Sequence, residues 1–138
     1  MKSLNKYMEL QQRKLEHMQQ RRQELLQQQQ LEETRLFQLN EHIDALTVQP
    51  GSNALLLQNM AQMKHQMQGL CQQQHQRVAE VSQDVGRQQQ ACSKQVGFNL
   101  GLQKLLQQRE MAEQLRQAKK EQHQLDELIT LRFHQHRP

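Results

Sequence analysis

The sequence is poor in the residues that build a compact core and in those that turn a chain. Among 138 residues there is no Trp, aromatic residues make up 3%, and hydrophobic residues make up 35%. A globular domain with a catalytic cleft needs more apolar material than this. Turn signals are also few, with two Pro and five Gly, and the good helix formers Gln, Leu, Glu, Lys, Arg and Met dominate instead. The composition therefore predicts long helices.

Long apolar runs are missing as well. The longest comprises residues 54–57, Ala-Leu-Leu-Leu, far short of the roughly 20 apolar residues that span a bilayer. The N-terminal residues include charged side chains but no apolar stretch that ends in small residues, as a secretory signal would. We expect no membrane span, no leader and a location in the cytosol.

Charge of one sign is not concentrated anywhere. The net charge is +4, from 18 basic and 14 acidic residues, and residues 1–48 carry seven of each sign. A surface that binds the phosphates of nucleic acid gathers Lys and Arg into a patch or stripe. A basic helical nucleic-acid-binding protein is therefore the weakest of the readings considered below.

Motifs for metal or catalytic chemistry are lacking. Cys71 and Cys92 are 21 residues apart, about 30 Å on one helix, which is too far for a disulfide. Cys71 and His75 have the helical i, i+4 spacing, but two ligands do not complete a zinc site. The sequence contains no HExxH, phosphate-binding loop or nucleophile elbow. We predict no enzymatic activity, no metal or other cofactor and no small-molecule substrate.

What the chain has is a heptad pattern. From Leu4 to Leu46 the stripe residues alternate in steps of three and four, which predicts one helix over about 3–48 with a single apolar stripe. Polar residues within such a stripe lower stability but fix register. Ser3 is the expected N-cap. The apolar members are Leu4, Met8, Leu15, Met18, Leu25, Leu36, Leu39, Ile43 and Leu46, and the polar members are Gln11, Arg22, Gln29 and Glu32.

The pattern stops where Pro50 and Gly51 meet other turn formers, which predicts a turn over 49–53. Ser52 or Asn53 can cap a second helix over about 54–134. Heptad spacing then resumes and slips once by about four residues, which predicts a stutter. The residues before the slip are Leu56, Met60, Met63, Met67 and Leu70, and those after it are Val78, Val81, Val85 and Cys92.

Two helices with narrow apolar stripes and a short turn predict an all-α fold, a two-helix antiparallel coiled-coil hairpin in a single domain, residues 1–138. Residue i should lie near residue 102 minus i, so the second helix overhangs the first at its C-terminal end, from about residue 100. This overhang remains amphipathic, which is typical of a partner-binding helix. Gly86, Gly97 and Gly101 near its start indicate either a bending zone or a close helix contact.

The segment Lys119-Lys120-Glu121-Gln122-His123-Gln124-Leu125-Asp126-Glu127-Leu128, with Arg132 behind it, resembles the C-terminal part of the FliJ family of flagellar export proteins. The order of long helix, turn and longer helix resembles that family and the related stalk proteins of injectisomes. The resemblance implies a cytosolic stalk of the type III export apparatus, shaped like the coiled coil of a rotary ATPase gamma subunit. It implies binding to the export ATPase hexamer and to the export-gate membrane protein, with peripheral association at the inner membrane, and export chaperones as further partners.

Carried onto this sequence, the resemblance implies two contact surfaces. Met60, Met63 and Met67 could serve either in the hairpin seam or in a contact, since Met adapts to varied partners. A generic coiled-coil scaffold or homodimeric export chaperone remains the alternative function, and flagellum versus injectisome stays open. The expected ATPase-binding residues are Met111, Leu115, Leu125, Asp126, Glu127 and Arg132, and the expected gate-binding residues are Asn59, Met63, Gln66 and Leu70.

Overall fold

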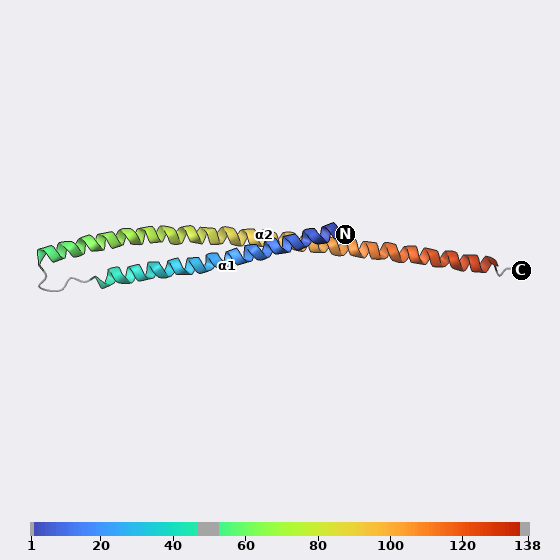
Figure 1. Cartoon of the computed structure of the whole chain (residues 1–138), viewed down its shortest axis with the longest axis horizontal. Helices are drawn as coiled ribbons and strands as arrows, with labels where there is room; N and C mark the ends of the chain where they lie inside the picture. The colour runs from blue at the N-terminus through green and yellow to red at the C-terminus, as the bar shows by residue number, and fades with distance from the viewer. Residues whose placement is uncertain (1, 47–52, 136–138) are drawn as a thin grey trace. The chain divides into compact units, whose positions relative to one another are not determined.

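The computed structural model describes residues 2–46 and 53–135, and this part of the chain consists of two helices without a strand. Helix α1 spans Lys2–Ala45 and helix α2 spans Ala54–Gln135 (Figure 1). The predicted all-α fold with a longer second helix is confirmed. Ser3 lies inside α1 and is not its N-cap. The predicted end of the first helix at residue 48, and the turn apart from Asn53, fall outside the described residues.

The start of α2 is capped by Asn53. Its side-chain Oδ1 accepts a hydrogen bond from the Leu56 backbone N–H at 2.8 Å, and its carbonyl accepts from Leu57 at 3.1 Å. The first N–H groups of a helix have no partner within the helix, so this contact satisfies a donor that the helix itself cannot. Of the two predicted caps, the structure confirms Asn53; Ser52 lies outside the described residues.

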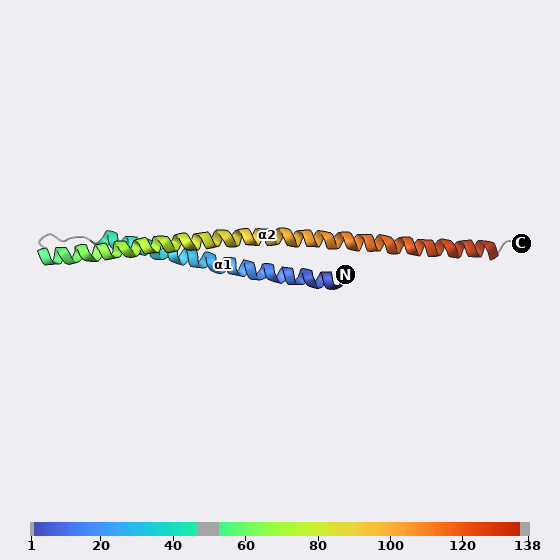
Figure 2. The ribbon, with the colours of Figure 1, turned by 90° about the horizontal axis from the view of Figure 1, so that it is seen from above.

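The chain divides into two compact units, and both helices contribute to each. One unit is Lys14–Lys94, and the other combines Met1–Arg13 with Gln95–Pro138. Within Lys14–Lys94, α1 and α2 lie side by side and run in opposite directions (Figures 1 and 2). The hydrogen bonds show the direction, because Gln74 contacts Glu32 whereas Gln88, further along α2, contacts Met18, nearer the start of α1.

The register of this antiparallel pair differs from the predicted one by at least one helical turn. Leu25 is buried against Val81 and Val85. The predicted pairing of residue i with residue 102 minus i would place residue 77 beside it instead. Glu32 meets Gln74 instead of residue 70. The sequence rule assumes that pairing begins symmetrically about the turn. In the structure α1 ends at Ala45, while residues 55–57, in the first turn of α2, remain exposed.

The predicted stutter is absent from α2. The residues that face α1 continue in heptad steps through the region where the slip was expected, and Met63 and Leu70 are instead exposed. Polar contacts explain the difference, since the Cys71 thiol donates to Asn40 Oδ1 at 3.1 Å and Gln74 donates to Glu32. The buried or half-buried residues of α2 in this unit that continue the heptad are Met60, Met67, Cys71, Gln74, Val78, Val81, Val85, Gln88 and Cys92.

Glu32 is the most deeply buried polar residue, with 3% of its surface exposed. Gln74 Nε2 donates to the Glu32 carbonyl at 2.9 Å and also to its carboxylate, and Arg35 contacts the other carboxylate oxygen at 3.0 Å. A buried carboxylate is costly unless it is paired and hydrogen-bonded. Because only one register supplies these partners, the contact specifies how the helices align. Arg22, also in the stripe, has a buried Nε without a hydrogen-bond partner.

A second polar contact lies in the other unit. Gln95 Nε2 donates to Gln11 Oε1 at 2.8 Å and to Asn99 Oδ1 at 2.9 Å, and Asn99 Nδ2 donates to the Gln11 carbonyl at 3.2 Å. Tyr7 packs edge-to-face on Phe98, with ring centroids 6.4 Å apart. Leu106 is the last buried residue of α2. Cover by α1 therefore extends about two turns beyond the predicted limit near residue 100.

The buried contact at Glu32 generates a prediction about stability. Gln74→Leu leaves the Glu32 carboxylate without its interhelical donor and should lower the free energy of unfolding by about 1–3 kcal/mol. The double variant Glu32→Leu with Gln74→Leu replaces the polar layer by an apolar one and should recover that loss. Urea unfolding followed by circular dichroism measures both, with Gln73→Leu, at an exposed neighbour, as the control. A double variant less stable than Gln74→Leu alone would contradict the assigned contact.

The Asn53 cap of α2 also generates a prediction about stability. Asn53→Ala removes the acceptor of the Leu56 N–H and should lower the free energy of unfolding by about 1 kcal/mol. Asn53→Ser keeps a capping oxygen and should stay close to the parent chain. Thermal unfolding of the three proteins at matched concentration tests this, and equal stability of the Ala and Ser variants would show that the cap contributes nothing.

Candidate functional site

Residues 107–135 of α2, here called the bare segment, have no cover from α1. Every side chain in this segment is exposed. Its 29 residues form about 43 Å of helix at about 1.5 Å per residue. The large apolar side chains expose between 57% and 69% of their surface, and they are Met111, Leu115, Leu125, Leu128, Ile129, Leu131 and Phe133. Exposed apolar side chains at this density mark an interaction surface.

The apolar stripe of the bare segment lies on the side of α2 opposite the hairpin seam. Continuing the seam residues Leu102 and Leu106 in heptad steps leads to charged residues, namely Arg109, Glu113 and Arg116. The apolar stripe is displaced from these positions by two residues, or about 200° around the helix. The stripe therefore forms a face of α2 that is separate from the seam. Heptad steps from Leu106 could have revealed this in the sequence, where the overhang was described only as amphipathic. The stripe comprises Met111, Leu115, Ala118, Leu125 and Ile129.

The charged side of the bare segment contains an ion pair within the helix. Arg116 Nη2 donates to Glu113 Oε1 at 2.7 Å. This hydrogen bond, aided by the charge of the partner, lowers the pKa of Glu113 and raises the pKa of Arg116. Both side chains are well exposed, and such pairs contribute little to stability. Arg116 and Glu113 thus satisfy each other within the helix.

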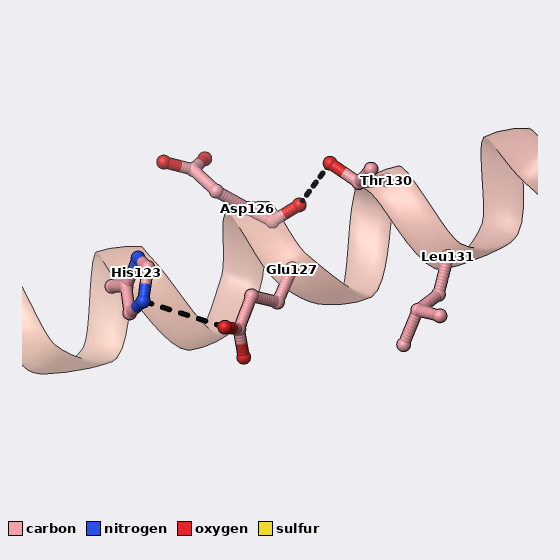
Figure 3. A pocket seen from close by; sticks show the side chains of 5 residues that line it. All are labelled: His123, Asp126, Glu127, Thr130 and Leu131. Atoms are coloured by element: carbon pink, nitrogen blue, oxygen red, sulfur yellow. Dashed lines mark hydrogen bonds and ion pairs between the residues drawn. The ribbon is translucent and has the colours of Figure 1, made fainter.

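The acidic pair Asp126 and Glu127 lies near the C-terminal end of the described chain. Together with His123, Thr130 and Leu131 it lines a shallow hollow on the surface of the single helix (Figure 3). His123 Nε2 lies 3.4 Å from Glu127 Oε1, and the Thr130 hydroxyl donates to the Asp126 carbonyl at 2.8 Å. Figure 3 shows the Asp126 carboxylate without a side-chain partner among the labelled residues. Arg132 is exposed in the next turn.

The four expected gate-binding residues, Asn59, Met63, Gln66 and Leu70, are all exposed on one flank of the seam in the Lys14–Lys94 unit. We call them the tip surface. Met63 exposes 51% of its surface and Leu70 exposes 52%. Leu56, one heptad before Met63 on the same side of α2, exposes 49%. Met60 and Met67 are half-buried toward α1. The structure thus places Met60 and Met67 in the seam, whereas Met63 is exposed beside it.

In the described part of the chain, no three His, Cys, Asp or Glu side chains are placed together to hold a metal ion. Cys71 and Cys92 are free and buried, and His75 is exposed. No helix over the described residues is long and apolar enough to span a bilayer. A Cβ added at Gly97 or at Gly101 would meet no atom within 4 Å, so no described residue makes the close contact that these glycines permit.

Comparison with known proteins identifies a family. No curated protein and no solved structure gave a match. The sequence model of the flagellar FliJ protein family matches residues 1–138, the whole chain. A match over the whole chain includes both helices of unequal length and the exposed end of the second helix. The chain belongs to the FliJ family, whose members are non-catalytic, cytoplasmic stalk proteins of the flagellar and type III export apparatus.

Proposed function

We propose that this chain is a coiled-coil stalk that binds the hexameric export ATPase through the bare segment and the export-gate membrane protein through the tip surface. The observation that carries this proposal is the apolar stripe of the bare segment, which no described residue covers. Through the gate the stalk would be held at the cytoplasmic face of the inner membrane. Export chaperones are further proposed partners, and the whole chain is proposed to act as one coiled-coil domain.

The energetics favour a partner for the bare segment. Full burial of one Leu, Ile, Phe or Met side chain stabilises a complex by about 1.5–3 kcal/mol, and seven such side chains are more than half exposed. An isolated helix gains nothing from them, whereas a groove or pore as wide as one helix would bury them together. Asp126, Glu127 and Arg132 lie within the same segment and can set orientation through charged groups at the rim of that site.

The tip surface has the composition of a small contact site. Met63 and Leu70 provide an apolar centre, and Asn59 and Gln66 provide hydrogen-bonding groups beside it. Interfaces commonly combine an apolar centre with a polar rim, and the flexible thioether of Met adapts to the partner surface. A partner that approaches this flank of α2 would not have to displace the hairpin seam.

Truncation tests the ATPase contact. Deleting residues 111–138 should abolish capture of the export ATPase while leaving the antiparallel pair intact, because the buried residues of α2 end at Leu106. Leu115→Gln with Leu125→Gln should weaken capture at least tenfold with helicity unchanged. The control, Gln117→Ala with Gln124→Ala, alters positions about 120° around the helix from the centre of the stripe and should bind normally. Pull-down and circular dichroism provide the readouts, and undiminished capture by the truncated chain would refute the assignment.

Charge substitution tests the gate contact. Met63→Glu with Leu70→Glu places two carboxylates in the apolar centre of the tip surface and should weaken binding of the cytoplasmic part of the gate at least tenfold, with loss of secretion. The control, Gln58→Glu with Gln72→Glu, adds equal charge on the other flank of the seam, where both residues are exposed. Equal binding by the two variants would rule out this surface.

A further inference from the structure

We propose that the first part of α2, residues 54–74, rocks about its own axis between two packing states, and that α1 covers the apolar residues of the tip surface in one of them. The structure shows the state in which Met63 and Leu70 are exposed. In the other state these two residues turn toward α1 and Lys64 and Cys71 turn away. The exposed column would then have two competing occupants, α1 of the same chain and a partner protein. This inference concerns regulation of the surface assigned above to the export gate.

Three columns of residues run along this part of α2. The central column, Met60, Met67 and Gln74, faces α1. On one side of it lie Leu57, Lys64 and Cys71, of which only Cys71 is buried, and on the other side lie Leu56, Met63 and Leu70, all exposed. Both outer columns keep heptad spacing with the central one, so either can complete the stripe. Exchange of one for the other needs a rotation of only about 50° in a heptad of 3.5 residues per turn.

The two states are stabilised by different interactions. The column now directed toward the seam contains a charged residue, Lys64, which stays exposed although its heptad position faces α1. The alternative column is wholly apolar, so burial favours the rotated state. Against this, the Cys71 thiol donates to Asn40 Oδ1 at 3.1 Å, and Gln74 donates to buried Glu32. The two polar contacts therefore stabilise the observed state, whereas burial of apolar side chains stabilises the rotated state.

The geometry also provides room for the motion. A hollow lined by Leu46, Leu57, Met60, Ala61 and Lys64 lies where the end of α1 meets the first turns of α2. Close-packed cores resist rotation of a helix, whereas an incompletely filled seam does not. Further along, Leu25, Val81 and Val85 form a buried cluster that fixes α2. The junction between the rotated and fixed parts would take the form of a stutter, which unwinds a coiled coil locally without breaking the helix.

A consequence for binding follows from the shared column. A partner that binds Met63 and Leu70 selects the state shown here, because those side chains are unavailable in the other. The apparent affinity of the partner for this chain falls as the fraction of chains in which α1 covers the column rises. Substitutions that disfavour the covered state without touching the contact residues should therefore tighten binding.

The two native thiols report on this motion in the isolated full-length protein. Cys71 and Cys92 are both buried in the observed state, but only Cys71 turns outward in the rotated one. Maleimide labelling under native conditions, with each site quantified by peptide mass spectrometry, should modify Cys71 at least tenfold faster than Cys92. Lys64→Leu, which gives the observed column an apolar residue, should slow the labelling of Cys71 several-fold and leave Cys92 unchanged.

A second variant separates rocking from simple fraying of the helix end. Met63→Gln with Leu70→Gln removes the apolar gain of the rotated state at two exposed positions and should also slow the labelling of Cys71. Fraying predicts unchanged labelling, because the two side chains are exposed in the observed state and their replacement removes no apolar contact there. Equal labelling of the two thiols, or unchanged or faster labelling of Cys71 in either variant, would overturn the proposal. These readouts need no partner, so they stand or fall independently of gate binding, which the charge substitutions test.

Discussion

Side-chain amides of α2 donate hydrogen bonds to backbone carbonyls of α1, and the alignment of the helices depends on these contacts. Gln74 reaches the Glu32 carbonyl, Gln88 reaches that of Met18, and Asn99 reaches that of Gln11. Apolar stripes made mostly of Leu and Met would tolerate a shift by one heptad at little cost. A shift of the polar groups would instead leave a carboxylate and several amides buried without partners, which is costly.

The alignment decides which parts of α2 are available to other proteins. Because Glu32 meets Gln74 instead of residue 70, the first turn of α2 remains exposed and the last buried residue is Leu106. The bare segment begins there. Its apolar stripe lies opposite the seam direction, so a longer α1 continuing along the seam would meet charged residues such as Arg109 and Glu113 instead.

The family assignment and the exposed apolar surfaces together support the proposed function. The family assignment makes this chain a stalk protein of flagellar and type III export, and the described residues hold apolar surface at both proposed sites. At the bare segment α1 leaves the apolar surface exposed, which suits the structural partner proposed there. At the tip surface the proposed second packing state would let the same apolar residues pack either on α1 or on a partner, and such a site would suit a contact that is made and released.

The sequence by itself determined the helices, their unequal lengths, the Asn53 cap and the exposed amphipathic end, because helix propensity, capping and heptad spacing are local properties. The heptad pattern placed Met63 and Leu70 in the stripe, but both are exposed. The register and the missing stutter were decided only by the tertiary structure. Each depends on residues distant in sequence, such as Glu32 with Gln74, whose buried hydrogen bonds outweigh the apolar pattern of Met63 and Leu70.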